Sequence, residues 1–368
     1  MKKNKATAAV FVGANKPFDL REYPITDLPE GYAGLSLLAS GVCGTDLHIH
    51  SGHLGCGPPA IIGHEFIGKI EKIKDGAVGG DGNPLKEGDN ALCYIACACG
   101  KCKLCYEEDD ANCVNMTATN GGNPEEAPHF WGGFAEYNYQ PINNLAKIPA
   151  EIDPVAASLF ACAGPTALHA FRLGRRASID PATADCAVVQ GAGPVGLFAV
   201  WYLASLGIKR VICVTGSANP EKIAAAKAFG ATDALALAEL GEDGVAAAIA
   251  DMNGGLGADL CYEGSGSRSA VPFGMRILRN RGVYLVPGQY SDQGKVEISP
   301  ELITFKALRI IGSSQYSMND IADYLAFLKE NKEMLPKMRS ILSTYPVADI
   351  NKAFEDAYKG RNIKTILV

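Results

Sequence analysis

The stretch DCAVVQGAGPVGLFAVWYLASLG, residues 185–207, constrains the fold of this chain more than any other feature. A short apolar run typical of a buried strand is followed by GAGPVG and then by an apolar segment of helical length. In that context the first helical turn exposes backbone amides that can hold a pyrophosphate, and the glycines allow a tight turn and close packing. The stretch therefore predicts a dinucleotide site made by Gly191, Gly193, Pro194, Val195 and Gly196.

The length and the pattern along the chain predict two domains. The chain has 368 residues, whereas single cores stop growing at roughly 250–300 residues. Strand and helix patterns alternate from residue 163 to about 302, as in a doubly wound parallel sheet of the Rossmann type. Residues 1–162 are β-rich, and residues 303–368 carry helical patterns before a last strand, IKTILV. We expect an α/β protein with a dinucleotide-binding domain at 163–302 and a discontinuous catalytic domain at 1–162 and 303–368.

The strand KRVICVT bears on the choice of dinucleotide. It ends at Thr215, where enzymes that use NAD carry an acidic residue for the ribose hydroxyls. The loop that follows offers Ser217, Asn219 and Lys222 as donors to a 2′-phosphate. These residues favour NADP(H) over NAD(H). No arginine follows at once to clamp the phosphate, and a serine-rich loop also accommodates NAD, so both cofactors remain open.

Five cysteines lie within CACGKCKLCYEEDDANC, residues 97–113. Four of them follow the spacing C-x2-C-x2-C-x7-C, which suits one tetrahedral Zn²⁺ with sulfur ligands; they are Cys99, Cys102, Cys105 and Cys113. Four protein ligands leave no position for a substrate, so the spacing predicts a structural zinc that orders a polar lobe. The alternative is a set of free thiols or a redox relay. Cys93 and Cys97 lie outside this register and are expected to be small, semi-buried residues.

A second set of metal ligands is spread along the chain. Cys43 in GVCGTDLH, His64 in GHE and Cys162 in LFACAGPTALH would form a Cys2His site whose fourth position is free. Each residue alone is weak evidence, because single cysteines and histidines are more often packed than ligating. Their occurrence together with the four-cysteine run and the glycine-rich turn predicts an open, catalytic metal site.

In this combination the sequence resembles the zinc-dependent alcohol dehydrogenases of the medium-chain dehydrogenase/reductase superfamily. The resemblance covers nearly the whole chain, from GVCGTDLH through GHEFIGKI, GGFAEY and GAGPVG to KTILV. It implies a GroES-like, β-rich catalytic domain with a structural zinc lobe at about 97–113. It also implies two zinc ions per chain, NAD(P)(H) as cofactor, and a homodimer or homotetramer.

The resemblance assigns roles to four further residues. Glu65 matches a carboxylate beside the zinc that can become a transient ligand, and Asp46 matches one that orients the ligand histidine. Thr45 matches the hydroxyl that hydrogen-bonds the alcohol, and His48 matches the histidine that passes the proton to solvent. Asp46 could equally be a solvated turn residue.

The implied reaction is interconversion of an alcohol and an aldehyde or ketone, by hydride transfer from a zinc-bound alkoxide to NAD(P). The alternatives are a polyol, sugar or amino-alcohol dehydrogenase of the same superfamily, and a catalytically silent nucleotide-binding sensor on the same fold. Ile95, Phe134 and Trp131 fall on segments that line the substrate pocket in the resembling enzymes. Phe134 could equally be a core residue.

Charge and hydropathy exclude several partners. The net charge of -6 provides no basic face for nucleic acid or an anionic membrane. No apolar run reaches the roughly 18–20 residues that would span a bilayer. The N-terminal MKKNKATAAVFVGA is basic and briefly apolar but has no convincing cleavage site. We expect a cytoplasmic enzyme that acts on a small molecule.

Overall fold

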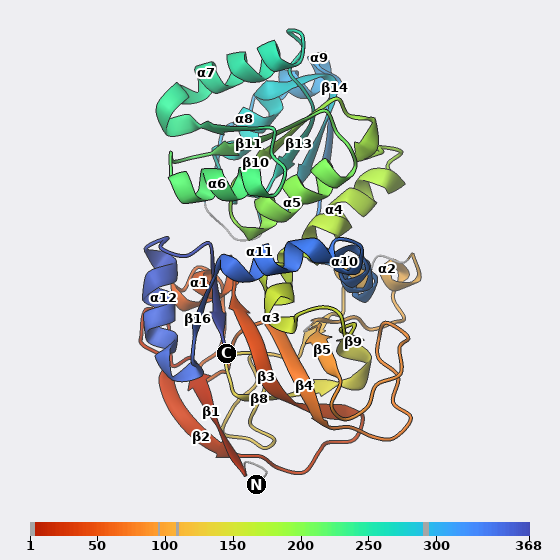
Figure 1. The fold of residues 1–368 in the computed structure, drawn as a ribbon, viewed down its shortest axis with the longest axis vertical. Helices are drawn as coiled ribbons and strands as arrows, with labels where there is room; N and C mark the ends of the chain where they lie inside the picture. The colour runs from red at the N-terminus through yellow and green to blue at the C-terminus, as the bar shows by residue number, and fades with distance from the viewer. Residues whose placement is uncertain (1–3, 95, 108–109, 290–293) are drawn as a thin grey trace. The chain divides into compact units, whose positions relative to one another are not determined.

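The computed structural model describes residues 4–94, 96–107, 110–289 and 294–368 (Figure 1). The chain divides into two compact units, one made of Met1–Pro165 with Tyr316–Val368 and the other of Thr166–Gln315. The assignment of a catalytic domain to residues 1–162 and 303–368, and of a nucleotide-binding domain to 163–302, stays a prediction.

The second unit is built on a six-stranded sheet in which all neighbouring strands are parallel. In spatial order its strands are β12 (Asp233–Ala236), β11 (Arg210–Thr215), β10 (Cys186–Gln190), β13 (Ala258–Glu263), β14 (Leu278–Val286) and β15 (Arg309–Gly312). All five residues of β10 are buried, because helices cover both faces of such a sheet and favour a continuous apolar run. The order reverses beside β10, which is the doubly wound topology expected from the sequence.

The helices of the second unit are α4 (Ala163–Arg176), which starts in the first unit, α5 (Pro194–Ser205), α6 (Pro220–Ala228), α7 (Leu237–Met252), α8 (Ala270–Ile277) and α9 (Glu301–Phe305). Helices α5 to α9 connect successive strands of the six-stranded sheet, as parallel pairing requires, and α4 precedes its first strand. Helix α5 packs on β10 and β11, whereas α8 packs on β13 and β14. Eight of the twelve residues of α5 are buried, which explains why its sequence is apolar on every side.

The first unit is dominated by a seven-stranded sheet of mainly antiparallel pairs. Its strands are β16 (Leu342–Tyr345), β17 (Lys364–Leu367), β3 (Tyr32–Val42), β4 (Glu65–Lys72), β5 (Asn90–Cys93) and β9 (Leu145–Lys147), with β8 (Tyr137–Pro141) on β3. Two small sheets pair β1 (Lys5–Val10) with β2 (Asp19–Pro24) and β6 (Ala96–Cys97) with β7 (Thr117–Ala118).

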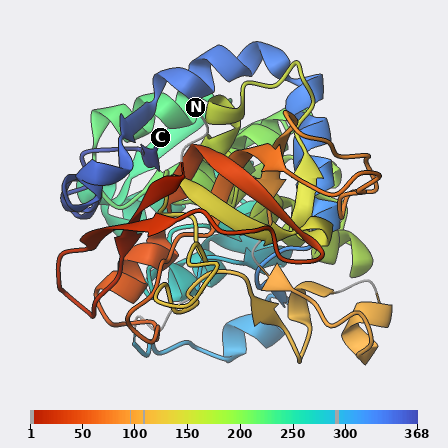
Figure 2. The ribbon, with the colours of Figure 1, turned by 90° about the horizontal axis from the view of Figure 1, so that it is seen from below.

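The C-terminal strand β17 inserts next to the long strand β3, so the first unit takes strands from both ends of the chain (Figure 2). Its helices are α1 (Gly44–His50), α2 (Lys103–Tyr106), α3 (Pro154–Ala157), α10 (Met318–Glu330), α11 (Leu335–Ser340) and α12 (Ile350–Tyr358). One core cluster joins residues of β1, the segment 130–139 and α12, among them Val10, Phe130 and Phe354. The discontinuous arrangement expected from the sequence is therefore present in the sheet pairing.

Several predicted elements are confirmed. The strands expected at 185–190 and KRVICVT are β10 and β11, and the helix after GAGPVG is α5. The last strand, IKTILV, is β17. Within the described residues, no single helix is long and apolar enough to cross a membrane; Pro154–Phe160 and Ala163–Arg176 pass that test only together, as a bent pair.

Candidate active site and metal centres

Four potential metal ligands from separate parts of the first unit lie together. The ligand atoms of Cys43, His64, Glu65 and Cys162 all lie within 4.8 Å of one another. His64 and Glu65 are buried, while the two cysteines are half-buried. In a tetrahedral zinc site with sulfur ligands at about 2.3 Å, neighbouring ligand atoms are about 3.8 Å apart, so this set fits such an ion.

Each ligand stands at the end of a secondary-structure element. Cys43 directly follows β3 and is the N-cap residue of α1. His64 directly precedes β4, whose first residue is Glu65, and Cys162 directly precedes α4. Because β3 and β4 pair with Gly41 opposite Glu65, the ends that carry Cys43 and His64 are brought side by side.

Asp46 supports two of these ligands at once. It is fully buried on α1, and its Oδ2 accepts a hydrogen bond of 2.9 Å from the backbone amide of Cys43. Its Oδ1 lies 3.2 Å from Nδ1 of His64. A proton on Nδ1 satisfies this contact and leaves the Nε2 lone pair of His64 for a metal. The alternative of a solvated turn residue for Asp46 is therefore wrong.

The two thiols of this centre have opposite titration behaviour. Their mutual hydrogen bond holds the pKa of Cys43 well below its usual range and raises that of Cys162. Burial would lower the pKa of His64, but the charges of Asp46 and Cys43 outweigh it and raise that pKa well above the usual value. Thiolate character at Cys43 is what a metal ligand requires.

A buried ion pair, which the sequence did not reveal, adjoins these ligands. Nζ of Lys364 lies 2.5 Å from Oε2 of Glu65, and the side chains are only 3% and 1% exposed. The contact joins an ammonium group to a carboxylate, so it is an ion pair. Burial raises the pKa of the Glu65 carboxyl to about 7, against the opposing effect of the Lys364 charge. Glu65 is thus held by a cation from the opposite end of the chain.

The register of three strands explains how this pair forms. Gly41 on β3 lies opposite Glu65 on β4 and opposite Ile366 on β17. A Cβ atom at Gly41 would lie 1.8 Å from Oε2 of Glu65 and 2.9 Å from Cε of Lys364. Only glycine leaves room for the pair. The one sequence signal for it is a lysine at the start of the strand KTIL, which is buried at all four positions.

Thr45 and His48 lie on α1 next to the ligand cysteine. Oγ1 of Thr45 is 3.9 Å from Sγ of Cys43, so the hydroxyl is near the candidate centre. His48 is half-buried, and burial, followed by the nearby His53, lowers the pKa of its imidazole. A neutral imidazole at neutral pH can accept a proton.

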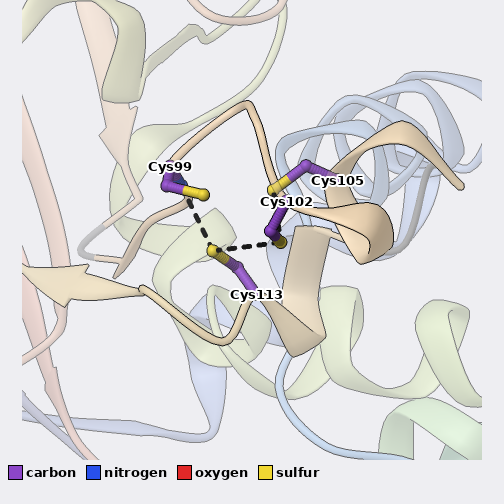
Figure 3. A group of neighbouring side chains, drawn as sticks. All are labelled: Cys99, Cys102, Cys105 and Cys113. Atoms are coloured by element: carbon purple, nitrogen blue, oxygen red, sulfur yellow. Dashed lines mark hydrogen bonds between the residues drawn. The ribbon is translucent and has the colours of Figure 1, made fainter.

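The other cysteine cluster forms a lobe around α2 and the 3-10 turn Asp110–Asn112 (Figure 3). The sulfur atoms of Cys99, Cys102, Cys105 and Cys113 point toward one another and lie within 4.8 Å. Cys102 is 3.5 Å from Cys105 and 3.9 Å from Cys113, close to the spacing of about 3.8 Å in a tetrahedral zinc–thiolate site.

Local backbone groups prepare this cluster for a metal. The backbone of Lys101 and then the side chain of Asn115 lower the pKa of Cys99 to about 6. The amide of Cys99 donates to Sγ of Cys113 over 3.2 Å. The contacts at Cys99 favour its thiolate form, which is the form that binds metal. Burial and then the neighbouring thiols raise the pKa of Cys105 to about 11. No pair of the twelve cysteines forms a disulfide.

The glycine-rich turn of the second unit has the conformation that the sequence predicts. Gly191 has φ of +99°, which favours glycine, and Gly193 is the N-cap residue of α5. A Cβ atom at Gly196 would lie 1.9 Å from the carbonyl oxygen of Gly191. Pro194 begins the helix, where its missing amide costs nothing, and Val195 follows it. The first turn of α5 is therefore available to an anion.

In the loop after β11, two of the residues considered for the adenosine end of the cofactor already have hydrogen-bond partners within the chain. Oγ1 of Thr215 donates to the carbonyl of Ser217 over 2.9 Å, and Thr215 is only 3% exposed. Oδ1 of Asn219 caps α6 by accepting from two backbone amides, so only its amide nitrogen remains as a donor. Ser217 is exposed and Lys222 half-buried.

The pocket residues suggested by the resemblance are not equivalent. Phe134 is fully buried and packs against Gly63, so it belongs to the core. Trp131 is half-buried and meets the ring of Tyr32 at a centroid distance of 5.9 Å. Ile95 lies outside the described residues. A separate cavity of about 860 Å³, lined by Thr26, Glu71 and other residues, shares no side chain with either cysteine centre.

Comparison with known proteins identifies the family. Residues 30–150 match the alcohol dehydrogenase GroES-like domain, and residues 194–330 match the zinc-binding dehydrogenase family. The chain is 31% identical to 5-exo-hydroxycamphor dehydrogenase of Pseudomonas putida over 98% of both chains. It is 27% identical to sorbitol dehydrogenase of Halalkalibacterium halodurans over 95% of both.

The structural comparison agrees with the sequence comparison. The crystal structure of an alcohol dehydrogenase from Thermotoga maritima superimposes with a TM-score of 0.91, at 28% identity and 99% coverage of both chains. With this fold, these ligand sets and these relatives, the chain belongs to the zinc-dependent alcohol dehydrogenases of the medium-chain dehydrogenase/reductase superfamily and is an oxidoreductase that acts on alcohols.

Proposed function

We propose that this enzyme interconverts a secondary alcohol and a ketone at the centre formed by Cys43, His64 and Cys162, with NADP(H) as the preferred nicotinamide cofactor. The observation that carries the proposal is the convergence of these ligands with Glu65, within 4.8 Å, next to the hydroxyl of Thr45. The relative named 5-exo-hydroxycamphor dehydrogenase supports a secondary hydroxyl group as the substrate.

Two bound groups would supply the chemistry that side chains lack. Cys43, His64 and Cys162 would hold a zinc ion that would lower the pKa of an alcohol, and an oxidised nicotinamide would supply the hydride acceptor. Cys99, Cys102, Cys105 and Cys113 would hold a second, structural zinc, giving two ions per chain.

The residues of the chain then bind and orient the alcohol and transfer its proton. The hydroxyl of Thr45 accepts the proton of the alcohol and fixes the orientation of its oxygen. His48 on the same helix receives the proton and releases it to solvent, which suits its lowered pKa. Asp46 holds His64 in the tautomer that presents Nε2. Lys364 holds Glu65 close to the centre but away from permanent ligation.

The proton relay has its own test. His48→Ala should slow turnover at low pH more than at high pH, where hydroxide can take the proton directly. His53→Ala, which removes a neighbour that lowers the pKa of His48, should keep the relay and move the pH profile toward higher pH. A profile of kcat against pH that His48→Ala leaves unchanged would remove His48 from the relay.

The proposed cofactor preference has support and one opposing feature. No carboxylate occupies position 215, and Ser217 and Lys222 can donate to a 2′-phosphate. Glu221, exposed in the first turn of α6, places a negative charge near the same region. Thr215→Asp should therefore weaken NADP binding much more than NAD binding, and Glu221→Gln should strengthen NADP binding. Equal effects on both cofactors would show that this loop does not discriminate.

A second candidate substrate class is a polyol, sugar or amino alcohol, which the sorbitol and threonine dehydrogenase relatives favour. The zinc-replete enzyme would be assayed with NADP and NAD against cyclic and acyclic secondary alcohols, primary alcohols, polyols, sugars and amino alcohols. The proposal predicts the highest kcat/KM for an apolar secondary alcohol with NADP. A polyol preferred over every simple secondary alcohol would favour the second candidate.

We further propose a cytoplasmic homodimer or homotetramer. Twelve free cysteines suit a reducing compartment. The edge strand β15 carries the exposed Ile310, and the neighbouring Phe305 is 80% exposed. Exposed apolar side chains at the edge of a sheet are usually buried against another surface, and a second copy of the chain can provide that surface. Sedimentation of the native enzyme as a monomer at micromolar concentration would contradict this part of the proposal.

A further inference from the structure

Glu263, the last residue of β13, makes an unusual set of contacts. It is fully buried, and its Oε1 accepts three hydrogen bonds: 2.8 Å from the amide of Ser265, 2.6 Å from its hydroxyl and 3.0 Å from the amide of Gly266. Its Oε2 accepts a bond of 3.0 Å from Nε2 of Gln289. Within the described part of the chain no ion pair to Glu263 is found.

A buried carboxylate is costly unless donors surround it. Here the donors come from the two loops that follow β13 and β14. The amide of Gly288 also donates to the carbonyl of Glu263, over 3.0 Å. A Cβ atom at Gly288 would lie 2.3 Å from Oε2 of Glu263, so the second loop passes directly against the carboxylate. Glu263 thus holds the loops 264–266 and 288–289 together.

These loops lie at the point where the strand order reverses. Glu263 pairs with Gln190, the last residue of β10, and the glycine-rich turn begins at the next residue. A Cβ atom at Gly191 would lie 2.9 Å from Cα of Ser265. A Cβ atom at Gly264 would lie 3.2 Å from the amide of Gly196. The loop that Glu263 organises is therefore packed against the predicted pyrophosphate site.

The position in the sheet indicates which half of the dinucleotide the loops face. In such sheets the dinucleotide spans the crevice at the reversal, with the adenosine half over the strand that ends in the ribose-binding residue. That strand is β11, on one side of β10, whereas β13 and β14 lie on the other side. The loops held by Glu263 are consequently on the nicotinamide side.

We propose that Glu263 is a positioning residue that shapes the nicotinamide end of the cofactor site by fixing the loops after β13 and β14. This inference rests on the proposed nicotinamide function. Glu263 acts through the loop backbone. A residue that only satisfied buried amides would affect stability and the binding of every nucleotide alike.

The test uses the zinc-replete, full-length enzyme with Glu263→Gln. The amide oxygen of glutamine can still accept from Ser265 and Gly266, but its NH₂ group then faces the NH₂ group of Gln289. Nε2 of Gln289 also donates to the carbonyl of Ser267 over 3.0 Å. Adding Gln289→Glu restores an acceptor opposite the new NH₂ group and gives up only that bond to Ser267. Binding of NADPH, NADH and 2′-phospho-ADP-ribose, which lacks nicotinamide, would be measured by titration, together with kcat, KM, zinc content and thermal unfolding.

Glu263→Gln should raise the dissociation constants of NADPH and NADH about 10-fold or more, as expected for loss of a charged hydrogen bond. The fragment without nicotinamide should change much less, and the double variant should recover most of the affinity. Equal weakening of dinucleotide and fragment, or no weakening of either, would overturn the inference. Wild-type enzyme that binds neither dinucleotide would instead overturn the proposed function, and this inference with it.

Glu263→Gln could also prevent folding. Gln289→Met then provides the test. It removes the donor to Oε2 of Glu263 and to the carbonyl of Ser267, and it leaves the carboxylate with its three bonds to Ser265 and Gly266. It should weaken both dinucleotides more than the fragment. The same affinity for all three ligands as in wild type would overturn the inference.

Discussion

The two cysteine centres of the first unit use similar ligands but are built in opposite ways. The lobe takes all four sulfur ligands from residues 99–113, and three of them are half-exposed. The other centre takes its ligands from segments spread between residues 43 and 162 and surrounds them with buried groups. Asp46 and Lys364 fix ligands there, whereas in the lobe the contacts come from the chain next to the cysteines.

This difference indicates how each centre depends on metal. A short polar segment with four thiolates has little apolar surface to bury, so metal binding supplies much of its folding free energy. The ligands at the ends of β3, β4 and α4 are positioned by strand register and by hydrogen bonds. We expect the lobe to lose its structure without zinc and the buried centre to keep its shape.

The largest effect on activity should come from substituting one cysteine ligand, in one centre at a time. Cys43→Ser should lower kcat/KM by about a thousandfold or more, because a catalytic metal contributes several kcal/mol to the barrier. Cys102→Ser should leave the chemical step intact but make residues 97–113 sensitive to protease. Activity assays, zinc analysis and limited proteolysis measure these outcomes.

Each of the two variants should lower the zinc content from about two ions per chain to about one. Cys56→Ser, at a half-buried thiol outside both centres, is the control and should keep both ions. Zinc content that falls to zero with Cys43→Ser alone would contradict two independent centres.

The next effect should come from the buried ion pair. Lys364→Met would leave the Glu65 carboxylate buried beside the metal ligands without its cation. We expect the free energy of unfolding to fall by about 3–5 kcal/mol, the usual result when one member of a buried pair is removed. Denaturant unfolding of wild type and variant would measure it.

The double variant Lys364→Met with Glu65→Gln distinguishes the effect of an unpaired charge from the effect of altered packing. Removing both charges should restore most of the lost stability. If the double variant were as unstable as Lys364→Met, packing around Gly41 rather than the unpaired charge would be the cause.

A smaller effect is expected from the support of His64. Asp46→Asn should weaken zinc binding at the buried centre about 10–100-fold, the range seen when a group behind a metal ligand is changed. The affinity of the lobe for zinc should not change. Competition with a chelator, read out as release of one or two ions, distinguishes the centres.

Asp320→Asn is a closely matched control for this prediction. Asp320 caps α10 as Asp46 caps α1, with its carboxylate accepting from the N-cap backbone amide. It should lose a comparable capping contribution, about 1 kcal/mol, with unchanged zinc affinity. Equal loss of zinc affinity in both variants would assign the effect of Asp46 to helix capping.

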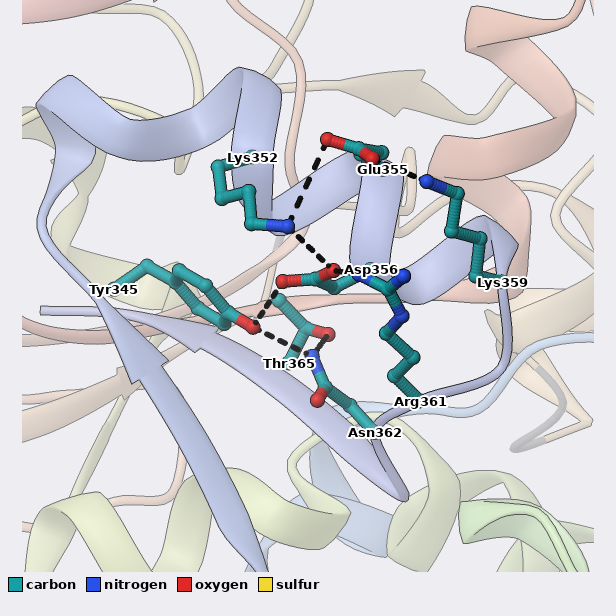
Figure 4. A network of polar contacts seen from close by, with 8 residues as sticks. All are labelled: Tyr345, Lys352, Glu355, Asp356, Lys359, Arg361, Asn362 and Thr365. Atoms are coloured by element: carbon teal, nitrogen blue, oxygen red, sulfur yellow. Dashed lines mark hydrogen bonds and ion pairs between the residues drawn. The ribbon is translucent and has the colours of Figure 1, made fainter.

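The smallest effect concerns the stability of the first unit at acid pH, to which helix α12 contributes. Asp356 on α12 accepts from Lys352, Arg361 and Tyr345, and these contacts lower its pKa to about 2 (Figure 4). Because the folded pKa lies below the unfolded value, near 3.9, the stabilisation is complete above about pH 4 and is lost as the pH falls toward 2. Asp356→Asn should reduce the fall in stability between pH 5 and pH 3.

Glu355→Gln serves as the comparison, because Glu355 lies on the same helix and pairs with Lys352 and Lys359 at the surface. Exposed pairs contribute little, so its acid dependence should be nearer to wild type. Unfolding midpoints in denaturant at pH 3 and pH 5 would be compared. The same slope for wild type and Asp356→Asn would exclude a role of this network in acid stability.

The sequence was informative where chemistry depends on near neighbours. The four-cysteine spacing and the GAGPVG turn depend on backbone geometry over a few residues, so both could be recognised directly. The strand before Gly191 was predicted to within one residue, whereas the helix begins at Pro194, three residues before the segment that the sequence indicated. The set Cys43, His64 and Cys162 was expected from its occurrence together with these two motifs and from the resemblance, since nothing local links residues so far apart.

Other features depend on contacts that no local pattern records. Thr215 was considered for its missing carboxylate, but the direction of its hydroxyl depends on the loop carbonyl of Ser217. Phe134 was ambiguous between pocket and core, and the packing around Gly63 decides for the core. Glu263 stands in an ordinary strand end, and its role appears only when the loop after β14 is placed beside it.

By itself, the sequence determined the class of this protein, its family and its glycine-rich turn, and it predicted the two candidate ligand sets. Spacing and residue type suffice for these, because each is set by chemistry that the chain carries locally or by a pattern shared across the family. Only the tertiary structure decided that Lys364 holds Glu65 across Gly41, that Asp46 supports two ligands and that Glu263 joins two loops. Those contacts follow from strand register and burial, which bring together residues that the sequence keeps far apart.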